Sequence, residues 1–267
     1  MIHLYKKYHV AYRIIGILLI VCMVASMIAL MFVSKLWFVP FLVFFPTLIL
    51  IFVNASVFTM LTSKKLNDEV TTLLLNCQAN DYINALKSLF KDKASKGVIV
   101  SIYNTFLAMG YVAIDDYDAV YDCCQKITAR NYQTEKCKSM IEYYLAKDQI
   151  EQAQQEIEML KELTSKLKPS KYKEGTETSI KNAEYVIRIK QGNYEGAEEH
   201  FQKMLDTIKP LYPLSKASYS YSLGRLLVLK GEPERAKEYL QTAYDVGGDT
   251  KYRKKAEEQL AKLSQGL

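Results

Sequence analysis

Few residues of this 267-residue chain have the types and spacing that catalysis needs. His200 is the one histidine beyond the first nine residues, and it follows Glu198 and Glu199. A histidine beside carboxylates can act as a general base, but no nucleophile or metal ligand accompanies it at a usable spacing. We therefore expect His200 to lie on an exposed face of a helix.

Other reactive groups also have simpler interpretations. Asp115 and Asp116 could bind a metal, but their place in a predicted turn suits the N-cap of a helix. Cys123 and Cys124 are adjacent, which is neither a zinc-ligand nor a redox spacing, so we expect small buried side chains. The sequence contains no phosphate-binding Gly-Lys-Ser/Thr loop and no His-Glu-x-x-His motif. We predict no catalytic residue, cofactor or metal, and hence no enzyme.

The positive charge of the chain is concentrated at its N-terminus. The net charge is +6. All of it comes from residues 1–65, which contain no Asp or Glu, and residues 66–267 are balanced. The sequence therefore lacks the basic stripe that binding to nucleic acid would require.

Two uncharged apolar runs, Ile14–Ser34 and Leu36–Ser63, dominate this basic region. Each is long enough for a helix of about 20 residues that crosses the hydrocarbon of a bilayer. We predict transmembrane helices over 11–33 and 36–61, after a cytoplasmic segment 1–10; a signal peptide followed by one anchor is the alternative. Basic residues flank both ends of this hairpin, so the expected location is the cell membrane, with both termini cytoplasmic and contact with lipid head groups.

A repeated pattern follows the apolar region. A polar turn precedes an aromatic residue, Ile or Pro, and a small residue stands three positions later, as in "QGNYEGAEEHF" (191–201). The recurring first residues are Tyr82, Tyr117, Ile150, Tyr194 and Pro233, and the following ones are Ala85, Val120, Ala153, Ala197 and Ala236. Apolar residues keep helical spacing throughout, so stacked pairs of antiparallel helices are expected.

This pattern resembles the tetratricopeptide repeat family over about residues 66–248. The last unit is the most similar, with Gly224, Gly231, Ala236 and Leu240, whereas the preceding unit has Tyr185 where the family prefers a small residue. The resemblance implies an all-α solenoid of about five helix pairs, and first helices that line a concave groove for a protein or peptide partner. Carried over by register, the groove residues are Ile102, Phe106, Met109, Lys138, Glu142, Asn182, Val186, Ile189, Tyr221 and Arg225.

Two further segments complete the predicted organisation. Residues 164–177 are polar and contain Pro169 and Gly175, so they are expected to form a loop. Residues 249–264 are expected to form a C-terminal capping helix with Asp249 at its N-cap. Its clustered Lys251, Arg253, Lys254 and Lys255 should lie in solvent; contact with lipid or an acidic partner is the alternative.

Two functions are consistent with this organisation. The first is a scaffold, of a bacterial type, that is anchored in the membrane and binds a protein or peptide on the cytoplasmic face. The second is a structural subunit of a larger transport, secretion or envelope-assembly complex. In that case the polar Asn54 would face an integral-membrane partner, whereas the small residues Ala25 and Ala29 are expected to contact the second span of the same chain.

Overall fold

The computed structural model divides the chain into two compact units, residues 1–69 and 70–267. In the N-terminal region the structure describes only the helical, exposed residues Ile17, Ile20, Val21, Val24, Ala25 and Ile28. Beyond it, the structure describes residues 68–90, 98–207 and 212–265. All the regular elements in these ranges are helices, which confirms the all-α prediction.

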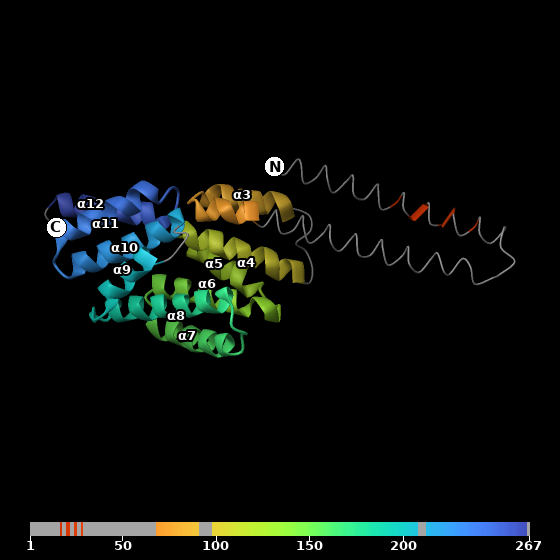
Figure 1. The fold of residues 1–267 in the computed structure, drawn as a ribbon, viewed down its shortest axis with the longest axis horizontal. Helices are drawn as coiled ribbons and strands as arrows, with labels where there is room; N and C mark the ends of the chain where they lie inside the picture. The colour runs from red at the N-terminus through yellow and green to blue at the C-terminus, as the bar shows by residue number, and fades with distance from the viewer. Residues whose placement is uncertain are drawn as a thin grey trace. The chain divides into compact units, whose positions relative to one another are not determined.

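The described part of the chain is a succession of helices (Figure 1). They are residues 68–75, α3 (Ala79–Phe90), α4 (Val98–Ala113), α5 (Tyr117–Gln125), α6 (Gln133–Ala146), α7 (Ile150–Ser165), α8 (Lys171–Lys190), α9 (Ala197–Thr207), α10 (Pro213–Leu229), α11 (Pro233–Val246) and α12 (Lys251–Ser264), with a 3-10 turn at Arg130–Tyr132.

Within each pair of consecutive antiparallel helices, the turn between the two helices contains a residue with a positive φ angle. These residues are Cys77, Asp115, Asp148, Gly192 and Gly231. Four of them lie two positions before the next helix, at α3, α5, α7 and α11. This shared geometry corrects the predicted alignment of the first unit, because Ala79, not Tyr82, is equivalent to Tyr117. The turn was missed because Cys77 occupies a position where glycine or aspartate is more usual.

Local sequence explains several helix starts. Asp116 is the N-cap of α5, and its Oδ1 accepts a hydrogen bond of 3.2 Å from the amide of Ala119, as predicted. Ser170 caps α8 in the same way. The predicted loop over 164–177 is wrong, because α7 continues to Ser165 and α8 begins at Lys171. The cap at Ser170 starts the helix before Gly175, whose cost in helix propensity is too small to prevent it.

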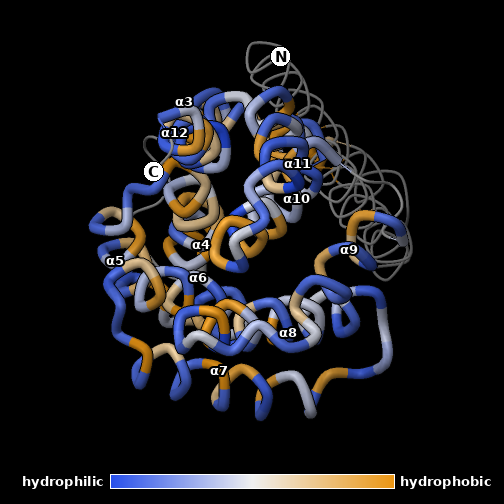
Figure 2. Tube along the Cα trace, turned by 90° about the vertical axis from the view of Figure 1, so that its left-hand side faces the viewer, coloured by the Kyte–Doolittle hydropathy of each residue, from blue (hydrophilic) through white to orange (hydrophobic). Residues whose placement is uncertain are grey.

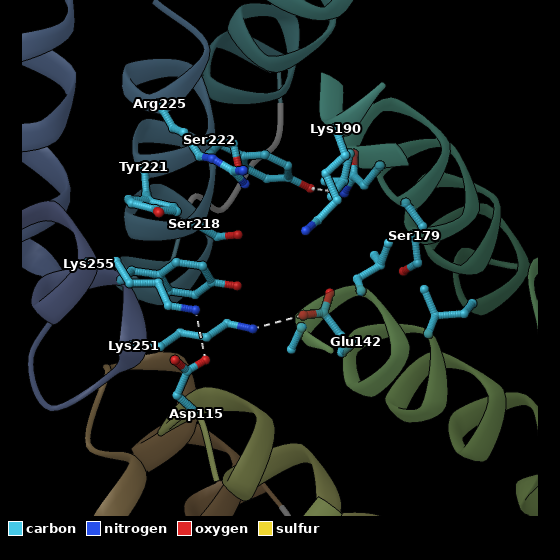
Figure 3. A pocket seen from close by; sticks show the side chains of 18 of the residues that line it. Asp115, Glu142, Ser179, Lys190, Ser218, Tyr221, Ser222, Arg225, Lys251 and Lys255 are labelled. Carbon is cyan, nitrogen blue, oxygen red and sulfur yellow. Dashed lines mark hydrogen bonds and ion pairs between the residues drawn. The ribbon is translucent and has the colours of Figure 1, made fainter. Parts of the chain in front are cut away.

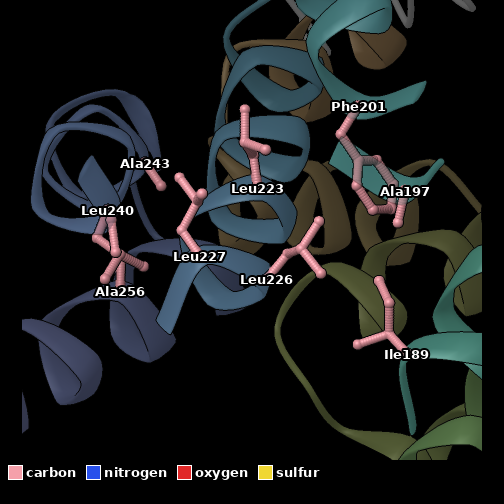
Figure 4. Packing of buried hydrophobic residues seen from close by; sticks show 10 residues of the cluster. Ile189, Ala197, Phe201, Leu223, Leu226, Leu227, Leu240, Ala243 and Ala256 are labelled. Atoms are coloured by element: carbon pink, nitrogen blue, oxygen red, sulfur yellow. The ribbon is translucent and has the colours of Figure 1, made fainter. Parts of the chain in front are cut away.

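Small residues decide how closely two helices approach. A Cβ atom placed on Gly224 of α10 would lie only 2.7 Å from Cγ of Leu240 on α11. Leu240 is fully buried in a cluster with Leu223, Leu227 and Ala243 (Figure 4). The equivalent residue of α8 is Tyr185, whose ring stacks on His200 of α9 at a centroid distance of 4.5 Å. The α8–α9 pair therefore packs through aromatic rings instead of close backbones.

The last helix lies beside the first helices of the same unit (Figure 2). Asp249, in the turn before α12, accepts hydrogen bonds from the amides of Ala79 (2.5 Å) and Asn80 (2.9 Å). Its own amide donates to the carbonyl of Cys77 at 3.0 Å. The prediction that Asp249 caps the last helix was therefore wrong. Asp249 caps α3, which lies 170 residues earlier, and Thr250 is the N-cap of α12. The 247–250 turn and α12 thus meet the end of the array that is formed by α3–α6. We call this junction the seam.

The predicted membrane location is contradicted. Among the described residues, no helix is both long and apolar enough to cross a bilayer. Helix α8 has 20 residues but carries charges along its length, and α4 is uncharged but has only 16 residues. The segments 11–33 and 36–61, apart from the six N-terminal helical positions, lie outside the described residues. So do Asn54 and the hairpin contacts on which the structural-subunit hypothesis depended.

The seam predicts an unusual sensitivity at Gly248. An added Cβ would lie 2.2 Å from the carbonyl oxygen of Cys77, and the φ angle of Gly248 is +54°. Gly231 has a similar φ of +76° but open space around it. We expect Gly231→Ala to lower the free energy of unfolding by about 1–2 kcal/mol, the cost of a left-handed alanine. Gly248→Ala should cost clearly more, because the seam must also move apart.

Urea denaturation of the full chain at neutral pH, followed by circular dichroism, measures both losses. Equal losses for the two variants would contradict the tight seam.

Candidate functional site

A cavity of about 690 Å³ lies inside the array of helices. Its walls are mainly α6, α8, α10 and α12, and Asp115 of the α4–α5 turn and Tyr117 at the start of α5 also line it. The lining is mixed: Ile141, Leu145 and Val186 are apolar, whereas serine and tyrosine hydroxyls and charged side chains fill much of the remainder. Its volume lies within the range of about 300–1,000 Å³ that is typical of ligand sites.

Six of the ten residues predicted for the groove come together in this cavity. They are Lys138, Glu142, Asn182, Val186, Tyr221 and Arg225. The other four do not line it. Ile102, Phe106 and Met109 lie on α4, and Ile189 is buried against Ala197 and Phe201. On α8 the residue that continues the cavity lining after Val186 is Lys190, one position beyond the predicted Ile189.

One end of the cavity is closed by ion pairs from α12 (Figure 3). Nζ of Lys251 lies 2.8 Å from Oε2 of Glu142 and donates to the hydroxyl of Tyr117 at 3.1 Å. Nζ of Lys255 lies 2.8 Å from Oδ1 of Asp115. The prediction that these two lysines lie in solvent was therefore wrong, because α12 turns this face toward the array and not outward. Arg253 and Lys254 of the same cluster are exposed, as predicted.

The pKa shifts follow from these contacts. Burial alone would lower the pKa of Lys251, but the charge of Glu142 and the neighbouring tyrosines Tyr252 and Tyr117 raise it well above the usual value. The positive charge of Lys251 lowers the pKa of Glu142, against an opposing effect of burial. Burial alone would raise the pKa of Asp115. The hydrogen bond from Lys255 and its charge outweigh burial, so the pKa of Asp115 is lowered. All three groups are thus charged at neutral pH.

The opposite end of the cavity has a different character. Figure 3 shows Arg225 and Ser222 on α10, with Lys190 on α8 across from them. Lys190 forms an ion pair with Asp148, whose side chain is 79% exposed. Arg225 lines the cavity but has no ion pair or hydrogen bond among the described residues.

A chain of hydrogen bonds connects α9, α8 and α10 beside the cavity. Nε2 of His200 lies 2.7 Å from Oδ1 of Asn182, and Nδ2 of Asn182 donates to the hydroxyl of Tyr219 at 3.2 Å. His200 is 6% exposed, so the prediction of an exposed position was wrong. The ring of Tyr185 stacks on the imidazole ring, and Asn182 forms the hydrogen bond with Nε2. A polar group can be buried at low cost when it is hydrogen-bonded in this way.

Burial determines the protonation of this histidine. It lowers the pKa of His200 to about 4, with smaller contributions from Lys181 and Lys203. His200 is therefore neutral at pH 7, and its Nε2–H donates to Asn182. The hydroxyl of Tyr219 accepts from Asn182 and keeps its own proton for another acceptor in the cavity.

The cysteines and carboxylates offer no metal site in the described part of the chain. No group of three His, Cys, Asp or Glu is placed to hold a metal ion there. Cys77, Cys123, Cys124 and Cys137 are free and buried, as expected for small packing residues. Burial raises the pKa of Cys77 and Cys123 to about 11 and that of Cys124 and Cys137 to about 12, so these thiols are protonated at neutral pH.

No protein-family model, curated protein or solved structure matches the chain. The resemblance to tetratricopeptide repeats therefore stays a prediction from the sequence.

The ion pair between Lys251 and Glu142 predicts an asymmetry between its two partners. The side chain of Lys251 is 6% exposed, whereas that of Glu142 is 45% exposed. Glu142→Gln would leave a buried ammonium unpaired, so we expect a loss near the range of about 3–5 kcal/mol for a broken buried pair. Lys251→Met should cost less, because water in the cavity can solvate Glu142.

Unfolding free energies of the two variants and of the double variant check this expectation. The double variant should be more stable than Glu142→Gln alone. Equal losses for the two single variants, or strictly additive losses, would contradict it.

The buried His200 predicts a decrease in stability in weak acid. Between pH of about 6.5 and about 4 the unfolded chain binds a proton at this residue that the folded chain does not. The free energy of unfolding should therefore fall as the pH drops from about 6.5, and should not depend on this residue above that pH. His200→Gln, which retains a donor for Asn182, should remove most of the decrease between pH 6.5 and 5, where carboxylates contribute little.

Denaturation midpoints in urea at pH 7, 6 and 5 test this for the wild-type chain and the variant. An equal decrease in both would show that His200 does not cause it.

Proposed function

We propose that residues 70–267 form a tetratricopeptide-like array of helix pairs that binds a short segment of a partner protein in its central cavity. The observation that carries the proposal is the cavity itself, which brings together six of the ten groove residues that the resemblance to tetratricopeptide repeats implies. Residues 68–75 with α3, α4 with α5, α6 with α7, α8 with α9, and α10 with α11 supply the five pairs, and α12 follows as the cap.

The lining of the cavity suits a polypeptide segment. Apolar patches at Ile141, Leu145 and Val186 can cover aliphatic side chains, and Ser179, Ser218 and Ser222 offer hydroxyl groups. Backbone amides and carbonyls need such a mixture of donors and acceptors when they leave water. The groups of the seam are already paired with one another, so they hold the walls in place and leave the central lining free to bind.

Blocking the cavity should abolish binding without unfolding the chain. Ser179 lines the cavity on α8, and its hydroxyl donates only to the carbonyl of Gly175 within the same helix. Ser165 at the end of α7 is exposed, lies outside the cavity lining and bonds in the same manner to Glu162. The pair Ser179→Trp and Ser165→Trp therefore compares equal changes inside and outside the cavity.

The test uses peptides selected from a random displayed library on the immobilised full chain. Their affinities are then measured in solution by fluorescence anisotropy. We expect Ser179→Trp to weaken binding by about tenfold or more, a loss of at least 1.4 kcal/mol, and Ser165→Trp to leave it unchanged. Selection of no peptide, or of peptides that bind the Ser179→Trp variant as well as the wild type, would overturn the proposal.

A further inference from the structure

The helix array consists of two bodies, α3–α8 and α9–α12. Among these helices, any two that pack closely along their backbones belong to the same body. The buried apolar side chains divide at almost the same place, since one cluster joins α6, α7 and α8 and another joins α9–α12. From α8, only Tyr185 and Ile189 contact the second cluster. The two bodies therefore meet through individual residues and not through packed helices.

One meeting point is the turn 191–196, which links α8 to α9. Two of its residues, Gly192 and Gly196, have positive φ angles of +80° and +70°. Beside the turn, α8 and α9 contact each other through the stacked rings of Tyr185 and His200 and not through close backbones. Hinges consist of a few residues at the ends of elements that absorb changes of φ and ψ, and glycine does so at the lowest steric cost. This turn therefore has the properties of a hinge.

The other meeting point is the seam, where the contacts are polar. Lys251 and Lys255 pair with Glu142 and Asp115, and Asp249 accepts hydrogen bonds from the amides at the start of α3. Helix α12 packs closely along α10 and α11, but along none of the helices α3–α6. When the whole seam separates, both partners of each ion pair return to water together, so no charge remains buried and alone. Opening the seam therefore costs less than separating two packed apolar helices.

The cavity lies between these two bodies. Helices α6 and α8 supply one wall, and α10 and α12 supply the other. Figure 3 shows Glu142 and Ser179 on one side of the space, opposite Ser218 and Ser222 on the other. A change in the angle between the bodies therefore changes the width of the cavity, whereas the core of each body stays intact.

We propose that the array opens and closes as a hinge, with the turn 191–196 as the hinge and the seam as the contact that separates. The structure shows the closed state, in which the ion pairs of the seam are formed. The motion is a property of the chain alone, and its response to a ligand rests on the proposed function. A segment that contacts both walls binds the closed state more tightly than the open one, so it shifts the population toward closure.

The first experiment measures opening of the seam through Cys77. This thiol is 1% exposed, and the 247–250 turn lies directly against it. Cys123 is the internal control, because it is also buried but lies on α5 inside the first body, and burial raises the pKa of both thiols to about 11. The full chain is treated with N-ethylmaleimide at neutral pH, and the modification of each cysteine is followed by mass spectrometry. We expect Cys77 to react about tenfold or more faster than Cys123, because opening of the seam needs less free energy than global unfolding.

A matched pair of variants links this rate to the seam. Lys255→Gln removes an ion pair of the seam, so it should raise the rate at Cys77 and leave the rate at Cys123 unchanged. Lys237→Gln removes an ion pair with Glu234 within α11, outside the cavity lining, and should change neither rate. Equal rates at the two cysteines, or equal effects of the two variants, would overturn the proposal.

The second experiment distinguishes a hinge from local fraying beside Cys77. In a Cys22→Ser chain, nitroxide labels on Gln125→Cys and Glu257→Cys stand at exposed positions of α5 and α12, one on each body. Labels on Gln125→Cys and Gln155→Cys stand on α5 and α7, both within the first body. Pulsed electron paramagnetic resonance should give a broader distance distribution for the first pair, with a longer component that increases in Lys255→Gln. A first distribution as narrow as the second, and unchanged by Lys255→Gln, would refute the hinge.

The third experiment adds peptides selected for binding to the chain. At saturation, they should slow the reaction of Cys77 by about tenfold or more and remove the longer component, as a shift of the population toward the closed state requires. If peptides bind but Cys77 reacts no faster than Cys123 with or without them, the hinge is refuted and the proposed function stands. If no peptide is selected but Cys77 and the labels report opening, the hinge is supported and peptide binding is refuted.

Discussion

The contact between the two ends of the helix array is the constraint on which the rest of the structure depends. A stack of helix pairs normally touches only its neighbours, so that its inner face forms an open groove. Here the carboxylate of Asp249 satisfies the free amides at the start of α3, and the backbone of the same turn lies directly against Cys77. This contact closes the array, and the inner face becomes the wall of a cavity.

The closing contact differs in kind from the packing elsewhere. On one side, α12 packs through Ala256, Leu260 and Leu263 against the apolar cluster of α10 and α11. Toward α3–α6, the turn before α12 presents Asp249 and the helix presents Lys251 and Lys255, and the contacts are hydrogen bonds and ion pairs. Apolar burial thus holds α12 to its own end of the chain, whereas geometry and charge determine where the other end meets it. Polar contacts of this type are directional, so they fix the width of the cavity more closely than apolar contacts would.

Local features of the fold could be predicted from the sequence, and features that depend on closure could not. The helical spacing of apolar residues predicted an all-α chain, and the turn at Asp116 predicted the cap of α5. By contrast, His200 looked exposed because Glu198 and Glu199 precede it, and no local pattern indicates that Tyr185 and Asn182 enclose it. The lysines of α12 looked solvent-facing because their carboxylate partners are more than 100 residues away. A pattern of charges shows which groups need partners, but only the tertiary arrangement shows which groups supply them.

Because of this contact, the two ends of the cavity also differ in charge pairing. At the seam, each lysine meets a carboxylate of the same chain, and the low exposure of Lys251 makes an exchange of partners costly. At the other end, Arg225 forms no ion pair within the described part of the chain, and Asp148, the exposed acceptor of Lys190, has its pKa lowered first by Lys190 and to a smaller extent by the charge of Arg225. The paired charges of the seam therefore define one end of the cavity, and the partly exposed cations of α8 and α10 define the other. An open groove with the same residues would not distinguish its ends in this way, because the lysines of α12 would then lie away from Glu142 and Asp115.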